Sequence, residues 1–261
     1  MISLISVNDK FMDVSPKELV EMISSSKYVK GIEFCVTDFN ELEEKYLDDL
    51  VFELKKHNLI LQVHGSSLYS LEKQYDFLKK MEYYANYLEQ QIVLTMHPLY
   101  DEDKNISQVK TSLYFDEVIK HSNNEKVVIC IENLNDIPNY DRLEKESIKP
   151  IVLNNEKLFF TYDIGHEIMD YGNITNLDSY VISKIKNVHL HSHDVIGNDH
   201  LPIYENDKYF SEILKAILFL INNKYCNAIV FEYNIFACSG NTIKEKVQDF
   251  LDSVDFVALH Y

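Results

Sequence analysis

The sequence predicts an α/β protein, a (β/α)8 TIM barrel that forms a single domain over residues 1–261. Short apolar runs alternate with amphipathic segments about eight times, a pattern typical of parallel strands joined by crossover helices. Runs such as Val127–Ile131 are apolar throughout, as strands buried on both faces are. The length of 261 residues also fits eight such units. A doubly wound open sheet is the alternative, but no glycine-rich turn follows the first apolar run.

The predicted strands are short apolar runs, most of them followed by a polar residue. In chain order they are Ile2–Val7, Gly31–Val36, Ile60–His64, Ile92–Met96, Val127–Ile131, Leu158–Tyr162, Asn187–Leu190 and Ala228–Phe231. Each run has the length of an ordinary strand and is rich in Val, Ile and Phe, residues that favour strands. The N-terminal run lacks the basic start and long apolar core of a signal peptide, so we expect it to be the first strand.

The helices are predicted from caps and from apolar side chains that recur at helical intervals. Ser15 is a suitable N-cap and Pro16 fits the first helical position, so a helix is expected to begin there. The other helical patterns cover Glu41–His57, Leu71–Leu88, Gln108–His121, Tyr209–Asn222 and Thr242–Val254. Ile174–Lys184 is a weaker helix, Asn139–Glu146 is short and highly charged, and the irregular stretch His193–Asp207 is expected to be a lid or a substrate loop.

Charge and cysteine usage limit the class of partner. The net charge is −17 and Arg142 is the only arginine, which argues against nucleic acid as a partner. The four cysteines form no CxxC pair, so we expect free thiols and a cytoplasmic protein. No apolar run is long enough to span a membrane. The expected partner is therefore a small molecule, and a homo-oligomer is compatible with the sequence.

Polar side chains stand at or just beyond the ends of six predicted strands. They are His64, His97, Glu132, Asp163, His189 and Glu232. In a parallel barrel all C-terminal strand ends meet on one rim, so these groups are expected to converge. Each has a simpler explanation alone: a histidine at a strand end is often structural, and a strand-end glutamate is often solvated. Together, carboxylates and imidazoles predict a divalent-metal site suited to Zn²⁺, Mn²⁺, Co²⁺ or Mg²⁺.

In their order along the chain, these residues belong to motifs that resemble the xylose isomerase-like TIM barrel superfamily. That superfamily includes sugar phosphate isomerases and epimerases, and also the AP endonuclease family 2 proteins such as endonuclease IV. The matching motifs are Val63-His64-Gly65, Met96-His97-Pro98, Ile131-Glu132-Asn133, Asp163–His166, Val188–His191, Asp199–Pro202 and Phe231-Glu232. They cover the third to the eighth strand, which is most of the chain.

The resemblance implies a role for each matching residue. The core metal ligands fall on Glu132, Asp163, His189 and Glu232, and the two glutamates are also the expected catalytic acid and base. Additional metal-binding or substrate-binding positions fall on His64, His97, His166, His200 and Asp199. The trinuclear zinc site of endonuclease IV has a carboxylate two residues before the last histidine. This chain has Asn198 there, with Asp199 next to it, and Tyr204-Glu205-Asn206 replaces a Gly-Glu-Gly stretch that many members carry.

The resemblance leaves three functions to compare. The favoured one is a divalent-metal-dependent isomerase or epimerase of a small sugar or sugar phosphate, using glutamate-mediated proton transfer via a metal-stabilised enediolate. The alternative is an endonuclease IV-like multi-zinc phosphoesterase, which the extra histidines favour and the acidic charge opposes. A non-catalytic ligand-binding barrel is the third. The cofactor is expected to be zinc, manganese or cobalt, with one ion favoured and up to three compatible with the histidines.

Three further residues have open interpretations. Glu33 lies inside an apolar strand, where a carboxylate needs a partner. Either it points into the barrel towards the site or it pairs with a neighbouring polar group. His191 and His193 share a strand face with His189 if the strand continues, and they are expected either to support the site or to face solvent.

Overall fold

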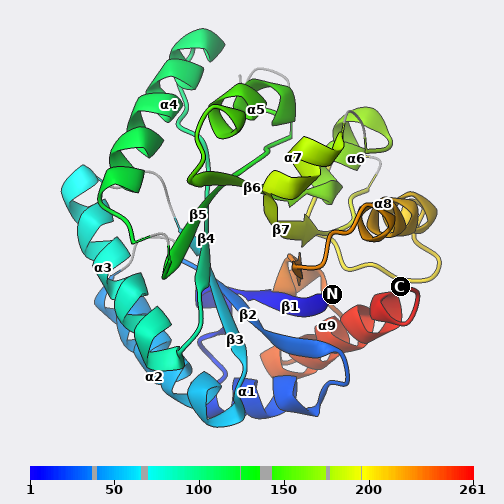
Figure 1. Ribbon diagram of the computed structural model, residues 1–261. Coiled ribbons are helices and arrows are strands. Elements are labelled where there is room, and N and C mark those ends of the chain that lie inside the picture. The colour runs from blue at the N-terminus through cyan, green and yellow to red at the C-terminus, as the bar shows by residue number, and fades with distance from the viewer. Residues whose placement is uncertain (37–39, 66–69, 124, 136–142, 175–176, 195) are drawn as a thin grey trace.

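The computed structural model describes residues 1–36, 40–65, 70–123, 125–135, 143–174, 177–194 and 196–261. Eight parallel strands close into a barrel in sequence order, and helices surround them (Figure 1). The strands are β1 Ile2–Val7, β2 Val29–Cys35, β3 Ile60–Gly65, β4 Ile92–Met96, β5 Val127–Glu132, β6 Leu158–Asp163, β7 Ile185–Leu190 and β8 Ala228–Phe231. This confirms the predicted (β/α)8 fold, and every predicted strand is present with its ends shifted by at most two residues.

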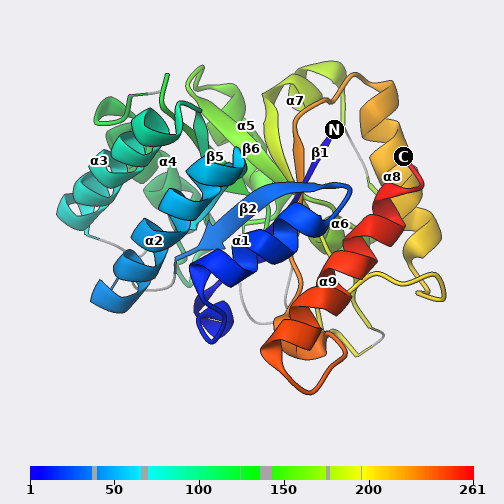
Figure 2. The ribbon, with the colours of Figure 1, turned by 90° about the horizontal axis from the view of Figure 1, so that it is seen from below.

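The helices of the described chain lie outside the barrel. They are α1 Pro16–Ser25, α2 Glu41–His57, α3 Leu71–Leu88, α4 Lys104–Lys120, α5 Lys145–Leu153, α6 Ile164–Tyr171, α7 Ser179–Lys184, α8 Phe210–Asn222 and α9 Ile243–Ala258. Short 3-10 turns occupy Asp9–Phe11 and Ile235–Ala237. None of these helices is both long and apolar enough to cross a membrane. The two termini lie side by side in both views (Figure 2), with Ser3 Oγ 3.0 Å from the Tyr261 hydroxyl.

The capping signals explain where several helices begin. Ser15 and Glu18 form a capping box at the start of α1, as the sequence predicts. Helix α4 begins four residues before the predicted helix, because Asp103 caps it by accepting from the backbone N–H groups of Asn105 and Ile106. Local side-chain caps therefore fix boundaries that apolar periodicity alone does not give.

Two helices are absent from the sequence prediction. Helix α5 contains Pro150, which normally argues against a helix, but Ile148 and Val152 are fully buried and hold it against the barrel. Helix α6 has only eight residues, starts immediately after β6 and includes Gly165. The weak helix predicted over Ile174–Lys184 is present only as α7. Part of the charged segment Asn139–Glu146 lies outside the described residues, and its described end begins α5.

The two faces of the barrel wall differ in chemistry. Outward-facing strand residues pack with the helices into one apolar core that includes Leu94, Ile129 and Val188. At the bottom of the barrel, Leu4, Ala228 and Val230 form a separate small apolar cluster. Between this cluster and the C-terminal rim lies a buried layer that is largely polar. Its members are Glu33, Gln62, Thr95, Thr161 and Asn187, none more than 5% exposed.

Candidate metal centre

Four side chains from four consecutive strands meet at the C-terminal rim. Asp163 and His189 end or nearly end β6 and β7, Glu132 ends β5, and Glu232 follows β8. His189 Nδ1 lies 2.6 Å from Glu132 Oε1 and 2.9 Å from Glu232 Oε2. One possible ligand atom from each of the four residues lies within 4.8 Å of the others. The structure therefore brings together the four residues to which the resemblance assigns the core metal.

Hydrogen bonds to two other residues hold Asp163 in place. Its Oδ1 accepts from the backbone N–H of His166 at 2.8 Å and so caps α6. The Asn133 side chain accepts from the Asp163 N–H at 2.8 Å and donates to the Asp163 carbonyl at 3.0 Å. These three bonds fix the backbone and one carboxylate oxygen. The second oxygen, Oδ2, lies 3.3 Å from Nδ1 of His166 but has no hydrogen bond from the described residues.

The donor set fits a divalent metal ion. Oε2 of Glu132, Oδ2 of Asp163 and Oε2 of Glu232 are buried and have no hydrogen-bond donor with suitable geometry in the described chain. A buried carboxylate oxygen without a partner costs free energy, and nearby imidazoles compensate it only partly. Three such oxygens beside an imidazole nitrogen match the ligand preferences of Mn²⁺, Co²⁺ and Zn²⁺.

The charges of the cluster shift its pKa values in opposite directions. Burial raises the pKa of Glu132, but the imidazoles of His189 and His64 outweigh burial and hold it well below the ordinary value. The pKa of Glu232 is lowered in the same way, mainly by His189. Burial lowers the pKa of His189, but Glu33, Glu132 and Glu232 together raise it well above its usual range. A metal ion must therefore displace a proton from His189, which makes metal affinity fall with acidity.

A second group of ligand atoms adjoins Glu132. His64 Nε2 and His97 Nε2 lie 2.9 Å apart, and each lies close to Glu132 Oε2, at 3.3 and 3.0 Å. The Nδ1 atom of His64 is also 3.4 Å from Glu232 Oε1. His97 therefore approaches the site despite preceding a proline, although its side chain is 48% exposed.

A third group is made of imidazoles. His166, His191 and His200 each offer a ring nitrogen, and these atoms lie within 4.8 Å of one another. Nδ1 of His166 contacts the Asn133 carbonyl at 3.0 Å, so its Nε2 is the atom left for a ligand. The rings of His191 and His200 are stacked, with centroids 4.3 Å apart. His191 is fully buried beside the site, so of the two interpretations that the sequence left open, exposure to solvent is wrong; its grouping with His166 and His200 is seen only in the structure.

Asp199 does not replace the carboxylate that Asn198 lacks. Its Oδ1 lies 3.0 Å from His200 Nδ1, on the opposite side of the ring from the site. The hydrogen bond to His200 is the main reason that the pKa of Asp199 is lowered to about 2. Asn198 donates to Asp194 Oδ2 at 2.7 Å within its own loop. Asp199 thus orients His200, and neither residue supplies a ligand atom to the clusters described above.

The remaining histidine of the ladder has a different place. His193 is buried and stacks on Tyr209, with ring centroids 3.9 Å apart, so it packs against the start of α8. The expectation that it faces solvent is wrong, because Tyr209 covers its ring. Its loop is irregular, as predicted, and is tied back by an antiparallel bridge between Ser192 and Leu201.

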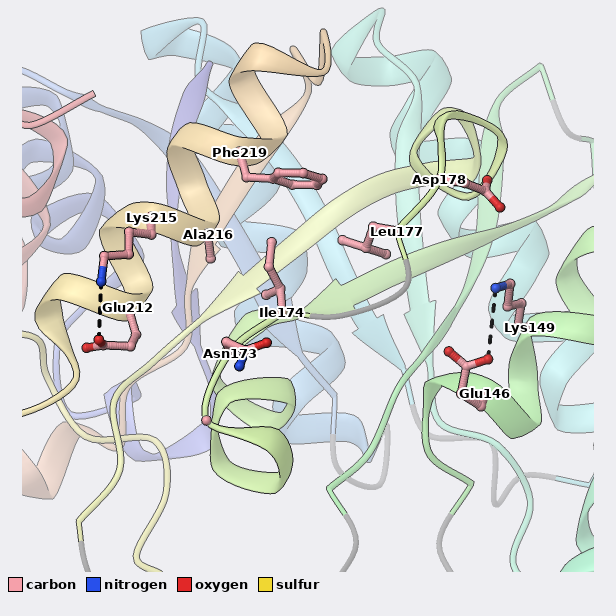
Figure 3. Close-up of a pocket in the computed structure, with 11 residues that line it drawn as sticks. Glu146, Lys149, Asn173, Ile174, Leu177, Asp178, Glu212, Lys215, Ala216 and Phe219 are labelled. Atoms are coloured by element: carbon pink, nitrogen blue, oxygen red, sulfur yellow. Dashed lines mark hydrogen bonds and ion pairs between the residues drawn. The ribbon is translucent and has the colours of Figure 1, made fainter.

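The site opens into a cavity of about 480 Å³ at the barrel mouth, and a larger cavity lies elsewhere. The mouth cavity is lined by His64, His97, Asp199, His200 and Glu232, among others. A cavity of about 940 Å³ lies on the outer surface between α5, the segment after α6 and α8 (Figure 3). Its lysines pair with its own glutamates, Lys215 with Glu212 at 3.5 Å and Lys149 with Glu146 at 3.9 Å. We place the candidate site at the smaller cavity, because Glu232, His64, His97 and His200 line it and lie beside the convergent carboxylates.

Comparison with protein families gives one match that covers most of the chain. The sequence profile of the family described as xylose isomerase-like TIM barrel matches residues 26–254. No curated protein sequence matches the chain.

Solved structures with the same fold include sugar epimerases and an endonuclease relative. A D-tagatose 3-epimerase-like protein is 17% identical with a TM-score of 0.69, over 100% of this chain and 97% of that one. A D-psicose 3-epimerase from Clostridium cellulolyticum H10 is 14% identical with a TM-score of 0.67, over 99% of each chain. An AP endonuclease, family 2, from Brucella melitensis is 17% identical with a TM-score of 0.60, over 94% of this chain and 96% of that one. At these identities the likeness shows a shared fold.

Proposed function

We propose that this chain, which belongs to the xylose isomerase-like TIM barrel family, is a divalent-metal-dependent isomerase or epimerase of a small sugar or sugar phosphate. One observation carries the proposal: two glutamates, the buried Glu132 and the partly exposed Glu232, approach the same nitrogen of His189 from neighbouring parts of the rim. Each keeps an oxygen without a hydrogen bond from the described residues. The names of several structural relatives, among them D-tagatose and D-psicose 3-epimerases, support a sugar as the substrate.

The residues of the site suit a proton transfer at carbon. A divalent ion held by Glu132, Asp163, His189 and Glu232 would polarise a sugar carbonyl and its neighbouring hydroxyl. Both glutamates are ionised at neutral pH, because their pKa values lie well below the ordinary value. One of them removes the proton from the carbon beside the carbonyl, and the same or the other glutamate returns a proton.

Glu132 and Glu232 differ in their exposure to the mouth cavity. Glu132 is 1% exposed and Glu232 borders the mouth cavity, so a substrate in that cavity meets one fully enclosed and one accessible carboxylate. The enclosed surroundings limit access of water to a carbanion-like species, which favours return of the proton to carbon. The geometry does not select between free and phosphorylated sugars, and both belong in the substrate screen.

A multi-zinc phosphoesterase is the second candidate, and a specific observation favours it. Besides the four-residue centre, the rim carries the His64–His97 pair and the group of His166, His191 and His200. A single-metal isomerase does not require so many imidazoles, whereas two or three zinc ions could use them to clamp a phosphate. The net charge of −17 opposes a DNA substrate, so a small phosphodiester is the better match for this alternative.

Deuterium exchange tests the proposal directly. Ketoses and ketose phosphates are incubated with the metal-loaded protein in D₂O, and NMR follows both deuterium at carbon and the appearance of the epimer or aldose. We expect exchange by the native protein and its loss in Glu132→Gln, with the circular dichroism spectrum unchanged. Glu125→Gln, an exposed residue at the opposite end of β5 from Glu132, is the matched control and should keep full activity. Hydrolysis of bis-p-nitrophenyl phosphate without any sugar exchange would instead establish the second candidate.

A further inference from the structure

Glu33 is fully buried in β2, one layer below the rim. Its Oε1 lies 2.8 Å from Nε2 of His189, which belongs to β7. Since β2 and β7 are not neighbours in the barrel, this contact crosses the interior. It resolves the choice left by the sequence, because Glu33 points into the barrel towards the site.

The two nitrogens of His189 face different groups. Nδ1 faces Glu132 and Glu232, at 2.6 and 2.9 Å, where the metal ligands converge. Nε2 faces Glu33 at 2.8 Å. Asn187 Nδ2 also lies 3.2 Å from Nε2, and a hydrogen bond from it would require the opposite tautomer. The carboxylate contact is the shorter of the two, the Asn187 amide already donates to Glu33, and Glu33 Oε1 has no well-aligned hydrogen bond from the described residues, so we place the hydrogen on Nε2, where it faces this oxygen.

The carboxylate of Glu33 is itself held in place. Its Oε2 accepts from Asn187 Nδ2 at 2.7 Å and from Thr95 Oγ1 at 3.3 Å. Thr95 in turn lies 2.7 Å from Thr161 Oγ1, so four strands contribute to one buried hydrogen-bonded network. No lysine or arginine in the described chain pairs with Glu33, and its only ion-pair partners are His189 and His64. A buried carboxylate arranged in this way acts on those imidazoles rather than on the surface charge.

We propose that Glu33 is a positioning residue of the metal centre. It accepts the Nε2–H of His189 and thereby fixes the ring and its tautomer, with the lone pair of Nδ1 directed at the ion. This rests on the proposed function, because it requires a metal held by His189. A carboxylate behind a ligating imidazole also makes that imidazole a stronger ligand, and loss of such a partner typically weakens metal binding by about 10–100-fold.

Zn²⁺ affinity is the decisive measurement. The metal-free native protein, Glu33→Ala, Glu33→Gln and Gln62→Ala are each titrated with Zn²⁺ against a competing chelator. Gln62 is the register partner of Glu33 on β3 and is also buried, and no hydrogen bond joins it to His189 in the described chain, so it is the matched control. We expect an affinity loss of about 10–100-fold in Glu33→Ala, a smaller loss in Glu33→Gln, whose amide oxygen still accepts, and no loss in Gln62→Ala.

A second readout separates positioning from a purely structural role. In the zinc-loaded native protein, proton–nitrogen NMR should show a slowly exchanging hydrogen on Nε2 of His189. That signal should persist in Glu33→Gln and in Gln62→Ala and be lost in Glu33→Ala. Should Glu33→Ala fail to fold, Glu33→Gln and the native spectrum decide the question.

The outcomes distinguish this inference from the function on which it rests. If the native protein binds no Zn²⁺, the proposed metal centre is wrong and Glu33 has no ligand to position. If the native protein binds Zn²⁺ and folded Glu33→Ala binds it equally tightly, only the positioning role is overturned. Native protein with its Nε2 unprotonated in the zinc complex would overturn it as well.

Discussion

The outward and inward faces of the same strands differ in almost every property. On β7, Val188 and Leu190 enter the apolar core beneath the helices, whereas Asn187 and His189 enter the barrel. Both pairs are fully buried. Water is excluded from both faces, so burial alone does not separate a structural position from a functional one.

The difference lies in how each buried group is satisfied. Outward side chains need only apolar neighbours of suitable volume, and many combinations provide that. The inward groups need specific partners: Asn187 donates to Glu33, which lies beside His189 across the barrel, and several buried carboxylate oxygens, Glu33 Oε1 among them, have no hydrogen bond from the described residues. The outward face therefore stabilises the fold, and the inward face presents the carboxylates and imidazoles that we propose hold a metal ion.

Asp163→Asn should have the largest effect of the three substitutions. It should lower turnover at the inward-facing site and leave the packing of the outward face unchanged. Asparagine is as good an N-cap as aspartate, so α6 should remain capped. The variant loses the charged oxygen of a core ligand, and we expect turnover to drop by about a thousandfold or more, equivalent to about 4 kcal/mol. Steady-state kinetics beside circular dichroism checks this. Full activity in the variant would place the catalytic centre elsewhere.

Leu94→Ala should lower stability without changing the site. Leu94 is fully buried in the outward core, next to the inward-facing Thr95. The cavity it leaves should lower the free energy of unfolding by about 3 kcal/mol. Urea unfolding of the metal-free protein measures the loss. The Zn²⁺ affinity of the folded variant should stay at the native value, and a large loss of affinity would show that the two faces are not independent.

Substitution of Asp199 should have the smallest effect, a change in the pH dependence of the free energy of unfolding that is seen only at acidic pH. Its pKa is about 2 in the folded protein against an ordinary value of 3.8. The stability it contributes is therefore complete above pH 3.8 and is lost as the pH falls towards 2. Because its side chain is 35% exposed, solvent screening should keep this contribution to about 1 kcal/mol or less.

Urea unfolding tests this contribution. The midpoints of the metal-free native protein and of Asp199→Asn are compared between pH 2 and a pH above 3.8. The difference in urea midpoint between the two proteins should be constant above pH 3.8 and should shrink as the pH falls towards 2. A gap that widens in acid would have the wrong sign for a carboxylate stabilised by His200.

The sequence was sufficient for most of the fold because strand runs and capping residues are local signals. It failed at α5 and α6, where Pro150 and Gly165 weaken the pattern and tertiary burial supplies the missing stability. The strand-end residues were predictable for a geometric reason, since all parallel strands end on one rim. The metal roles assigned to them stay predictions.

The partners of the site residues were not predictable in the same way. That Glu33 meets His189, or that His191 joins His166 and His200, depends on the barrel's stagger and on side-chain orientation. Neither the stagger nor the side-chain orientation can be predicted from local apolar periodicity. Asp199 shows the same limit, because only the structure reveals that its carboxylate contacts Nδ1 of His200 while the residue lines the mouth cavity.

The most direct test of this account is the metal content of protein purified without chelator, measured by plasma mass spectrometry beside Asp163→Asn. We predict a single tightly bound divalent ion per native chain and its loss from the variant. Two or three zinc ions per chain would favour the phosphoesterase. Native protein that holds no metal, and takes up none on titration, would contradict the claim that the inward face of this barrel is a metal centre.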